Sequence, residues 1–223
     1  FNKLIEKTNF AMSNEETRYY LNGVYLHVLG NTLKAIATDG HRLASVDLEV
    51  PEGANGMPGI IIPRKAVNEI GKLLENQEEI TISLSESKIK FSAEKVELLS
   101  KVVDGTFPDY QRVIPENNNK SLSIPTEILK SAVDRVSTIA ADKTKAIKFA
   151  MASNKLSLAS QGIEGTSATE ELDAEYNSDE VEIGFNSRYV MEMLSQIESE
   201  NVRFAFDTPN SPSLVTDPSD SSV

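Results

Sequence analysis

A nine-residue pattern occurs twice in this sequence, first as Ile62-Pro63-Arg64-Lys65-Ala66-Val67-Asn68-Glu69-Ile70 and again as Phe185-Asn186-Ser187-Arg188-Tyr189-Val190-Met191-Glu192-Met193. Each copy has a residue suited to a helix start, Pro63 or Asn186, followed by apolar residues at helical spacing. Two more amphipathic helices begin near Asn2 and Pro125, so the steps between helix starts are 61, 62 and 61 residues. A fixed period of this size indicates a repeated structural unit.

Short alternating stretches between the helices predict antiparallel strands, and Asn22-Gly23 and Gly30-Asn31 predict two of the turns that join them. The first helix is expected over 2–12. The strands are expected over 18–21, 24–29, 33–38, 42–49, 80–84, 88–93, 96–102, 146–152, 155–160, 165–174, 202–207 and 213–216. This order predicts an α+β fold of repeated helix-plus-strand units, with the helices on one face of the sheets. The alternative is an ordinary α+β protein whose helix spacing is accidental.

Two repeats make a domain of ordinary size, so the sequence predicts two domains, 1–118 and 119–223. The polar stretch 117–120 has no periodicity and is the predicted linker. The second domain is expected to be truncated at its end, because the polar tail 217–223 stops before a closing strand appears.

Composition excludes several classes of protein. There is no cysteine, which excludes disulfides and thiolate metal sites. No apolar run is long enough for a membrane helix, so no membrane partner is expected. The net charge is −12 and is uneven: residues 1–120 carry −3 and residues 121–223 carry −9. Such a charge opposes nucleic acid binding, although a local basic face can overrule the total.

The densest polar cluster is Thr38-Asp39-Gly40-His41-Arg42-Leu43-Ala44. Asp39 and His41 could form an acid/base pair of a hydrolase, yet Asp-Gly between two strands is a common hairpin turn. The other histidine, His27, lies within a predicted strand, and two separate histidines do not make a zinc site. With no phosphate-binding glycine loop and no nucleophile elbow, we expect no enzyme activity, no cofactor and no metal.

The predicted helices carry a modest excess of basic residues on their polar faces, mixed with acids. These basic residues are Lys3, Lys7, Arg64, Lys65, Lys72, Lys130, Arg135 and Arg188. Such faces suit either nucleic acid or plain solvent.

Several motifs, in this order along the chain, resemble the bacterial DNA polymerase III beta subunit family, the sliding clamps. They are Arg18-Tyr19-Tyr20-Leu21-Asn22-Gly23, Thr38-Asp39-Gly40-His41-Arg42-Leu43-Ala44, Ile62-Pro63-Arg64-Lys65, Val103-Asp104-Gly105-x-Phe107-Pro108-Asp109-Tyr110 and Ile183-Gly184-Phe185-Asn186-x-x-Tyr189-Val190. The resemblance covers the whole chain and corresponds to the second and third domains of a three-domain clamp.

The resemblance implies a DNA-clamp fold, in which helices line a central hole and sheets form the rim. It implies a non-catalytic processivity factor of the cytoplasm: a homodimeric ring, in its full-length form, that encircles duplex DNA without reading its sequence. The implied protein partners are the DNA polymerase III catalytic subunit, the clamp loader, and other polymerases and repair factors that carry short hydrophobic binding motifs.

The resemblance also implies two sets of site residues. A peptide-docking cleft between the two domains would involve Arg18, Tyr20, Leu21, Thr38, Gly40, His41, Arg42, Leu43, Pro108, Arg112, Val113, Asn186 and Tyr189. The residues implied to face DNA are Tyr19, Arg64 and Lys65.

The chain departs from the family pattern at both ends. The family's first domain and its last strand with a Met-Pro-Met-Arg-like tail are absent, and residues 210–212 fit the family loosely. We therefore expect that this chain alone does not close a ring. A peptide-docking scaffold without a role on DNA is the alternative function from another class.

Overall fold

The computed structural model describes residues 1–74, 79–94, 96–140, 145–220 and 222. They form two compact units, one of Phe1–Pro108 with Ser222 and one that begins at Asp109. The domain boundary predicted from the sequence, after residue 118, lies further along the chain than this change of unit. Asn118 already belongs to the second unit, because its side-chain amide donates to the carbonyls of Ala205 and Pro212 at 2.9 and 3.0 Å.

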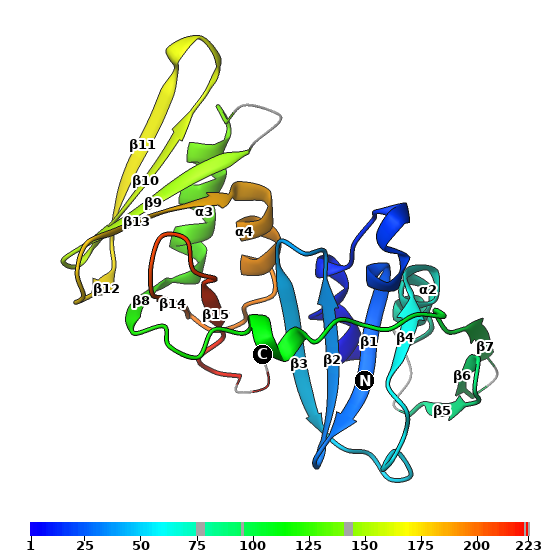
Figure 1. Cartoon of the computed structure of the whole chain (residues 1–223). Coiled ribbons are helices and arrows are strands. Elements are labelled where there is room, and N and C mark those ends of the chain that lie inside the picture. The colour runs from blue at the N-terminus through cyan, green and yellow to red at the C-terminus, as the bar shows by residue number, and fades with distance from the viewer. Residues whose placement is uncertain (75–78, 95, 141–144, 221, 223) are drawn as a thin grey trace. The chain divides into compact units, whose positions relative to one another are not determined.

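The first unit has two antiparallel sheets, with strand orders β3-β2-β1-β4 and β5-β6-β7. Its elements are α1 (Asn2–Glu6), η1 (Asn9–Ala11), η2 (Glu16–Leu21), β1 (Gly23–Leu29), β2 (Thr32–Thr38), β3 (Leu43–Glu49), β4 (Ile60–Pro63), α2 (Arg64–Leu74), β5 (Thr81–Leu84), β6 (Lys88–Ala93) and β7 (Val96–Lys101). Helices α1 and α2 contact each other. Figure 1 shows α2 next to β4, the strand that leads into it.

The second unit also has two antiparallel sheets, with orders β11-β10-β9-β13 and β12-β8-β14-β15. Its elements are η3 (Tyr110–Val113), β8 (Lys120–Pro125), α3 (Thr126–Ser137), β9 (Ala146–Ala152), β10 (Lys155–Gln161), η4 (Ile163–Gly165), β11 (Ser167–Asp173), β12 (Glu175–Tyr176), β13 (Val181–Asn186), α4 (Ser187–Leu194), β14 (Asn201–Phe206) and β15 (Leu214–Thr216).

The two units repeat one arrangement, which confirms the α+β fold of repeated antiparallel units. The order β3-β2-β1-β4 of the first unit matches β11-β10-β9-β13 of the second. In both, the last strand of that sheet runs directly into a helix, β4 into α2 and β13 into α4. These strands, and β8 before α3, were not predicted from the sequence, because a short strand that continues into a helix has no turn to mark it.

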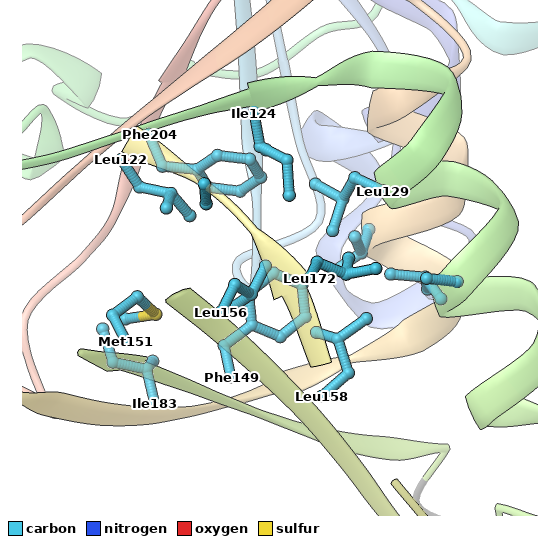
Figure 2. Packing of buried hydrophobic residues seen from close by; sticks show 14 of the residues in the cluster. Leu122, Ile124, Leu129, Phe149, Met151, Leu156, Leu158, Leu172, Ile183 and Phe204 are labelled. Carbon is cyan, nitrogen blue, oxygen red and sulfur yellow. The ribbon is translucent and has the colours of Figure 1, made fainter. Parts of the chain in front are cut away.

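Each unit has its own hydrophobic core between its helices and its sheets. In the first unit, buried Leu4 and Ile5 of α1 and Val67 and Ile70 of α2 pack with the sheet residues. Figure 2 shows the second core, where Leu129 of α3 lies among side chains of the surrounding strands. Full burial of one such side chain contributes roughly 1.5–3 kcal/mol, so these apolar stripes hold the helices on the sheets.

Two predictions near the N-terminus are wrong. The helix predicted over 2–12 ends at Glu6, and the buried Thr8 hydroxyl donates to the Leu4 carbonyl at 2.6 Å, a bond that competes with regular helix geometry. The strand predicted over 18–21 is the helical turn η2. Asn22-Gly23, predicted as a hairpin turn, instead connects η2 to β1. Gly23 is the first residue of β1, and a Cβ atom there would collide with the Ile62 carbonyl.

Other expected elements are confirmed within one or two residues. Gly30, at a φ of +61°, forms the turn between β1 and β2, and the side chain of Asn186 accepts from the amides of Arg188 and Tyr189 at the start of α4. Among the described residues, no helix is long and apolar enough to cross a membrane.

Candidate functional site

The polar turn between β2 and β3 is held by its own side chains. The Thr38 hydroxyl donates to the Arg42 carbonyl at 2.6 Å and accepts from the Gly40 amide at 3.0 Å. The Asp39 carboxylate accepts from the amides of His41 and Arg42 at 2.9 and 3.0 Å. Asp39 is therefore engaged in holding the turn, which is the role that the Asp-Gly pattern predicts.

Arg42 connects this turn to the N-terminal segment. Its Nε donates to Asp39 at 3.2 Å, its Nη2 donates to the Phe10 carbonyl at 2.7 Å, and its guanidinium carbon lies 5.2 Å from the centre of the Phe10 ring. A cation over an aromatic face and a charged hydrogen bond are both stabilising. Arg42 thus holds the turn in place, and its side chain is only 18% exposed.

Arg18 lies against the same turn from η2. Its Nε and Nη2 donate to the two Glu15 oxygens at 2.7 and 2.5 Å, and the hydrogen bond from Arg18 lowers the pKa of the Glu15 carboxyl. Gly40 has a φ of +88°, and a Cβ atom there would collide with Nη1 of Arg18. The missing side chain of Gly40 therefore makes room for the guanidinium.

The segment after β7 lies close to β4 and to Tyr20 of η2. The Val103 amide donates to the Ile61 carbonyl at 2.9 Å, which places the segment beside β4. A Cβ on Gly105 would lie 3.1 Å from the Cβ of Tyr20, so the chain passes close to that residue. Phe107 is buried and stacks on Tyr25, with ring centres 4.7 Å apart and planes 7° apart, while Pro108 is exposed.

The predicted site residues of the first unit thus divide by exposure. Leu21 is 4% exposed and belongs to the interior. Gly40, His41 and Pro108 are exposed, and the remaining members, Arg18, Tyr20, Thr38, Arg42 and Leu43, are half-buried. We call these eight accessible residues the turn surface. The sequence reading missed Glu15 and Phe10, the partners of its arginines; only the position of Glu15, three residues before Arg18, was a signal.

The four predicted site residues of the second unit lie on η3 and at the start of α4. Arg112 is well exposed and pairs with Asp109 at 2.7 Å, and Val113 is 56% exposed. Asn186 caps α4, so its side-chain oxygen is already engaged, and Tyr189 is half-buried in the first turn of that helix.

The three residues implied to face DNA differ in their surroundings. Tyr19 and Lys65 are exposed. Arg64 is half-buried, its Nη2 donates to the carbonyls of Met12 and Ser13 at 2.8 and 2.6 Å, and burial lowers its pKa. Arg64 therefore connects α2 to the segment after η1 through these hydrogen bonds.

Two shallow depressions, of about 290 and 420 Å³, lie elsewhere, on the sheet β12-β8-β14-β15 and beside it. Both include Ser123 and Glu175 and are lined mainly by small polar and charged side chains. Within the described ranges, no group of three or more His, Asp or Glu residues could hold a metal ion.

Comparison with known protein families gives two adjacent matches. Residues 1–109 match the family model of the DNA polymerase III beta subunit, central domain, and residues 111–223 match that of its C-terminal domain.

Curated relatives match over nearly the whole chain. The Beta sliding clamp of Caulobacter vibrioides is 45% identical over 226 residues, covering 99% of this chain and 61% of that protein. The Beta sliding clamp of Pseudomonas aeruginosa is 37% identical, covering 96% of this chain and 58% of that protein.

Solved structures agree with these relatives. A crystal structure of the Caulobacter crescentus beta sliding clamp with polyethylene glycol bound matches with a TM-score of 0.97 and 44% identity, over 99% of this chain and 60% of that one. A sliding clamp from Bartonella birtlesii bound to griselimycin matches with a TM-score of 0.96 and 46% identity, over 99% and 61%. The chain therefore spans about three-fifths of the length of these relatives.

Proposed function

This chain belongs to the DNA polymerase III beta subunit family, of which it comprises the central and C-terminal domains, and we propose that it works as part of a processivity factor. The full-length protein forms a homodimeric ring around duplex DNA in the cytoplasm and tethers the replicative polymerase. It catalyses no reaction itself. Family membership over 99% of the chain is the observation that carries this proposal.

Retention on DNA by a ring does not require a basic protein. A closed ring holds DNA by enclosing it, so a few positive charges on the inner face suffice, and contacts to phosphates carry no sequence information. We assign Lys65 and Tyr19, both exposed, and the anchored Arg64 to the face that meets DNA. The net charge of −12 then keeps this chain, outside a ring, from binding phosphates tightly.

The turn surface is proposed to dock short peptides, and Arg112, Val113, Asn186 and Tyr189 of the second unit are proposed as a further set of peptide contacts. Half-buried Tyr20 and Leu43 offer apolar contact, and half-buried Arg18 has N–H donors besides the two that bind Glu15. A few apolar anchors with a polar rim are typical of short-peptide recognition. The proposed ligands are the DNA polymerase III catalytic subunit, the clamp loader, and other polymerases and repair factors with short hydrophobic motifs.

The docking proposal is tested by calorimetric titration of a Gln-Leu-x-Leu-Phe peptide. We expect micromolar-class affinity at best, about −8 kcal/mol. A Leu43→Asp variant should lose at least about tenfold in affinity. Leu29→Asp is the matched control, since Leu29 is an exposed leucine at the far end of β1. Equal affinity of both variants and the unchanged chain would remove Leu43 from the site.

A peptide-docking scaffold without a role on DNA remains the rival function. Light scattering of the full-length protein separates the two, because a clamp is a closed dimer and a scaffold need not be. Retention on circular but not on linear duplex DNA would support the clamp, and equal loss from both would favour the scaffold.

A further inference from the structure

The dipeptide Asn-Gly occurs twice in this chain, at Asn22-Gly23 and at Asn55-Gly56. It is the sequence most open to spontaneous deamidation, because glycine leaves the following backbone nitrogen sterically accessible to the asparagine side chain. The tertiary structure places the two copies in opposite environments. We propose that Asn55 is a site of spontaneous modification to aspartate and isoaspartate, and that Asn22 is protected by the fold.

Asn55-Gly56 lies in the connection between β3 and β4, at the tip of a tight turn. The Met57 amide donates to the Ala54 carbonyl at 3.1 Å, and Gly56 has a φ of +78°, as at the third position of a type II turn. Asn55 and Gly56 are both exposed, and no atom lies within 4 Å of where a Gly56 Cβ would be. Within the described part of the chain, the Gly56 amide donates to no acceptor.

The chemistry needs only water. The deprotonated Gly56 nitrogen attacks the side-chain carbonyl carbon of Asn55, and the new N–C bond displaces Nδ2 as ammonia. The product is a five-membered succinimide. Water then adds to one of the two ring carbonyls and breaks its C–N bond, which yields aspartate or, when the backbone carbonyl is attacked, isoaspartate. Asparagine and one water thus become an acid and ammonia, and the chain gains one negative charge.

Asn22, by contrast, is held by three hydrogen bonds. Its amide donates to the Tyr19 carbonyl at 3.0 Å, its carbonyl accepts from the Arg64 amide at 2.9 Å, and its side-chain Nδ2 donates to the Glu15 carbonyl at 3.0 Å. Gly23 is buried at the start of β1. The attack would require the Asn22 side chain to rotate and its Nδ2 to leave, so this segment must first open locally.

The test is peptide mapping by mass spectrometry after incubation of this chain in mildly alkaline buffer, with and without urea. In native protein, Asn55 should convert at least about tenfold faster than Asn22, which corresponds to about 1.4 kcal/mol of local opening at Asn22. In urea the two rates should become similar, because both sites have lost the fold. Electron-based fragmentation separates aspartate from isoaspartate at each site.

An Asn55→Gln variant provides the control for charge. Its isoelectric profile should keep one main species while the unchanged chain accumulates a more acidic one. Similar native rates at the two sites, a faster rate at Asn22, or no conversion of Asn55 in native protein would each overturn the proposal. This result is independent of docking or DNA retention.

Discussion

The guanidinium of Arg18 occupies the space in which a side chain on Gly40 would stand. Gly40 also has a φ of +88°, a backbone conformation that is strained for a residue with a Cβ atom. Two separate penalties therefore oppose any other residue at position 40, one from the backbone and one from Arg18.

We predict that Gly40→Ala lowers the free energy of unfolding by about 1–2 kcal/mol and weakens peptide docking, because Arg18 must leave the turn. Gly30→Ala is the matched control: Gly30 also has a positive φ, +61°, but no atom lies within 4 Å of its Cβ position. Urea denaturation and calorimetric titration of both variants measure the effects. A Gly40→Ala variant no worse than Gly30→Ala in either assay would show that the Arg18 contact is unimportant.

The stack of Phe107 on Tyr25 should hold the segment after β7 on the sheet. We expect Phe107→Leu to reduce the unfolding free energy by about 1 kcal/mol beyond the loss of buried area, since leucine keeps bulk but not the ring. A double-mutant cycle with Tyr25→Leu measures the coupling. Strictly additive effects would mean that the two rings do not stabilise each other.

Arg64 and Lys65 are neighbours in sequence but should behave differently. Arg64→Ala removes the donor to two carbonyls and is expected to cost about 1–3 kcal/mol of unfolding free energy. Lys65→Ala, at an exposed position, should change stability by no more than about 0.5 kcal/mol. In the full-length protein, Lys65→Ala should still speed loss from circular DNA, most clearly at low salt, because rising salt screens the phosphate contact that the variant lacks. Equal stability of the two variants would contradict the anchoring role of Arg64.

Asp217 ties the C-terminal segment to the loop after α4. Its carboxylate accepts from the amides of Glu198 at 2.8 Å, Ser199 at 3.2 Å and Ser219 at 2.9 Å. Burial alone would raise the pKa of this carboxyl, but these hydrogen bonds outweigh burial and lower the pKa far below its ordinary value. The charged form is therefore favoured by folding.

Because the folded state lowers this pKa, the stabilisation is fully present above the unfolded pKa, about 3.9, and disappears as the pH falls toward the folded pKa. Asp217→Asn should cost about 1–3 kcal/mol at neutral pH and should flatten the acid side of the stability curve. Asp134→Asn, on the exposed face of α3, serves as control. Unfolding in urea at a series of pH values measures both, and parallel curves for Asp217→Asn and the unchanged chain would refute the assignment.

Sequence alone determined the repeat and the fold class. The helix starts at Pro63, Pro125 and Asn186 follow from local chemistry, since a helix cap and an apolar stripe depend on residues a few positions apart. The same holds for the Asp39-Gly40 turn, whose hydrogen bonds join residues within four positions. The family motifs were also visible in sequence, because each is a continuous stretch.

Tertiary structure decided which of those residues are accessible and what holds them. Leu21 and Arg18 lie three positions apart, yet Leu21 enters the core while Arg18 covers Gly40. Arg64 and Lys65 are adjacent basic residues that the sequence does not distinguish. The Arg64 guanidinium, however, donates to carbonyls 51 and 52 positions away. The two Asn-Gly pairs are identical in sequence and differ only in what surrounds them. Exposure and distant hydrogen bonds are set by how the chain packs on itself, and a linear pattern of local preferences does not contain that information.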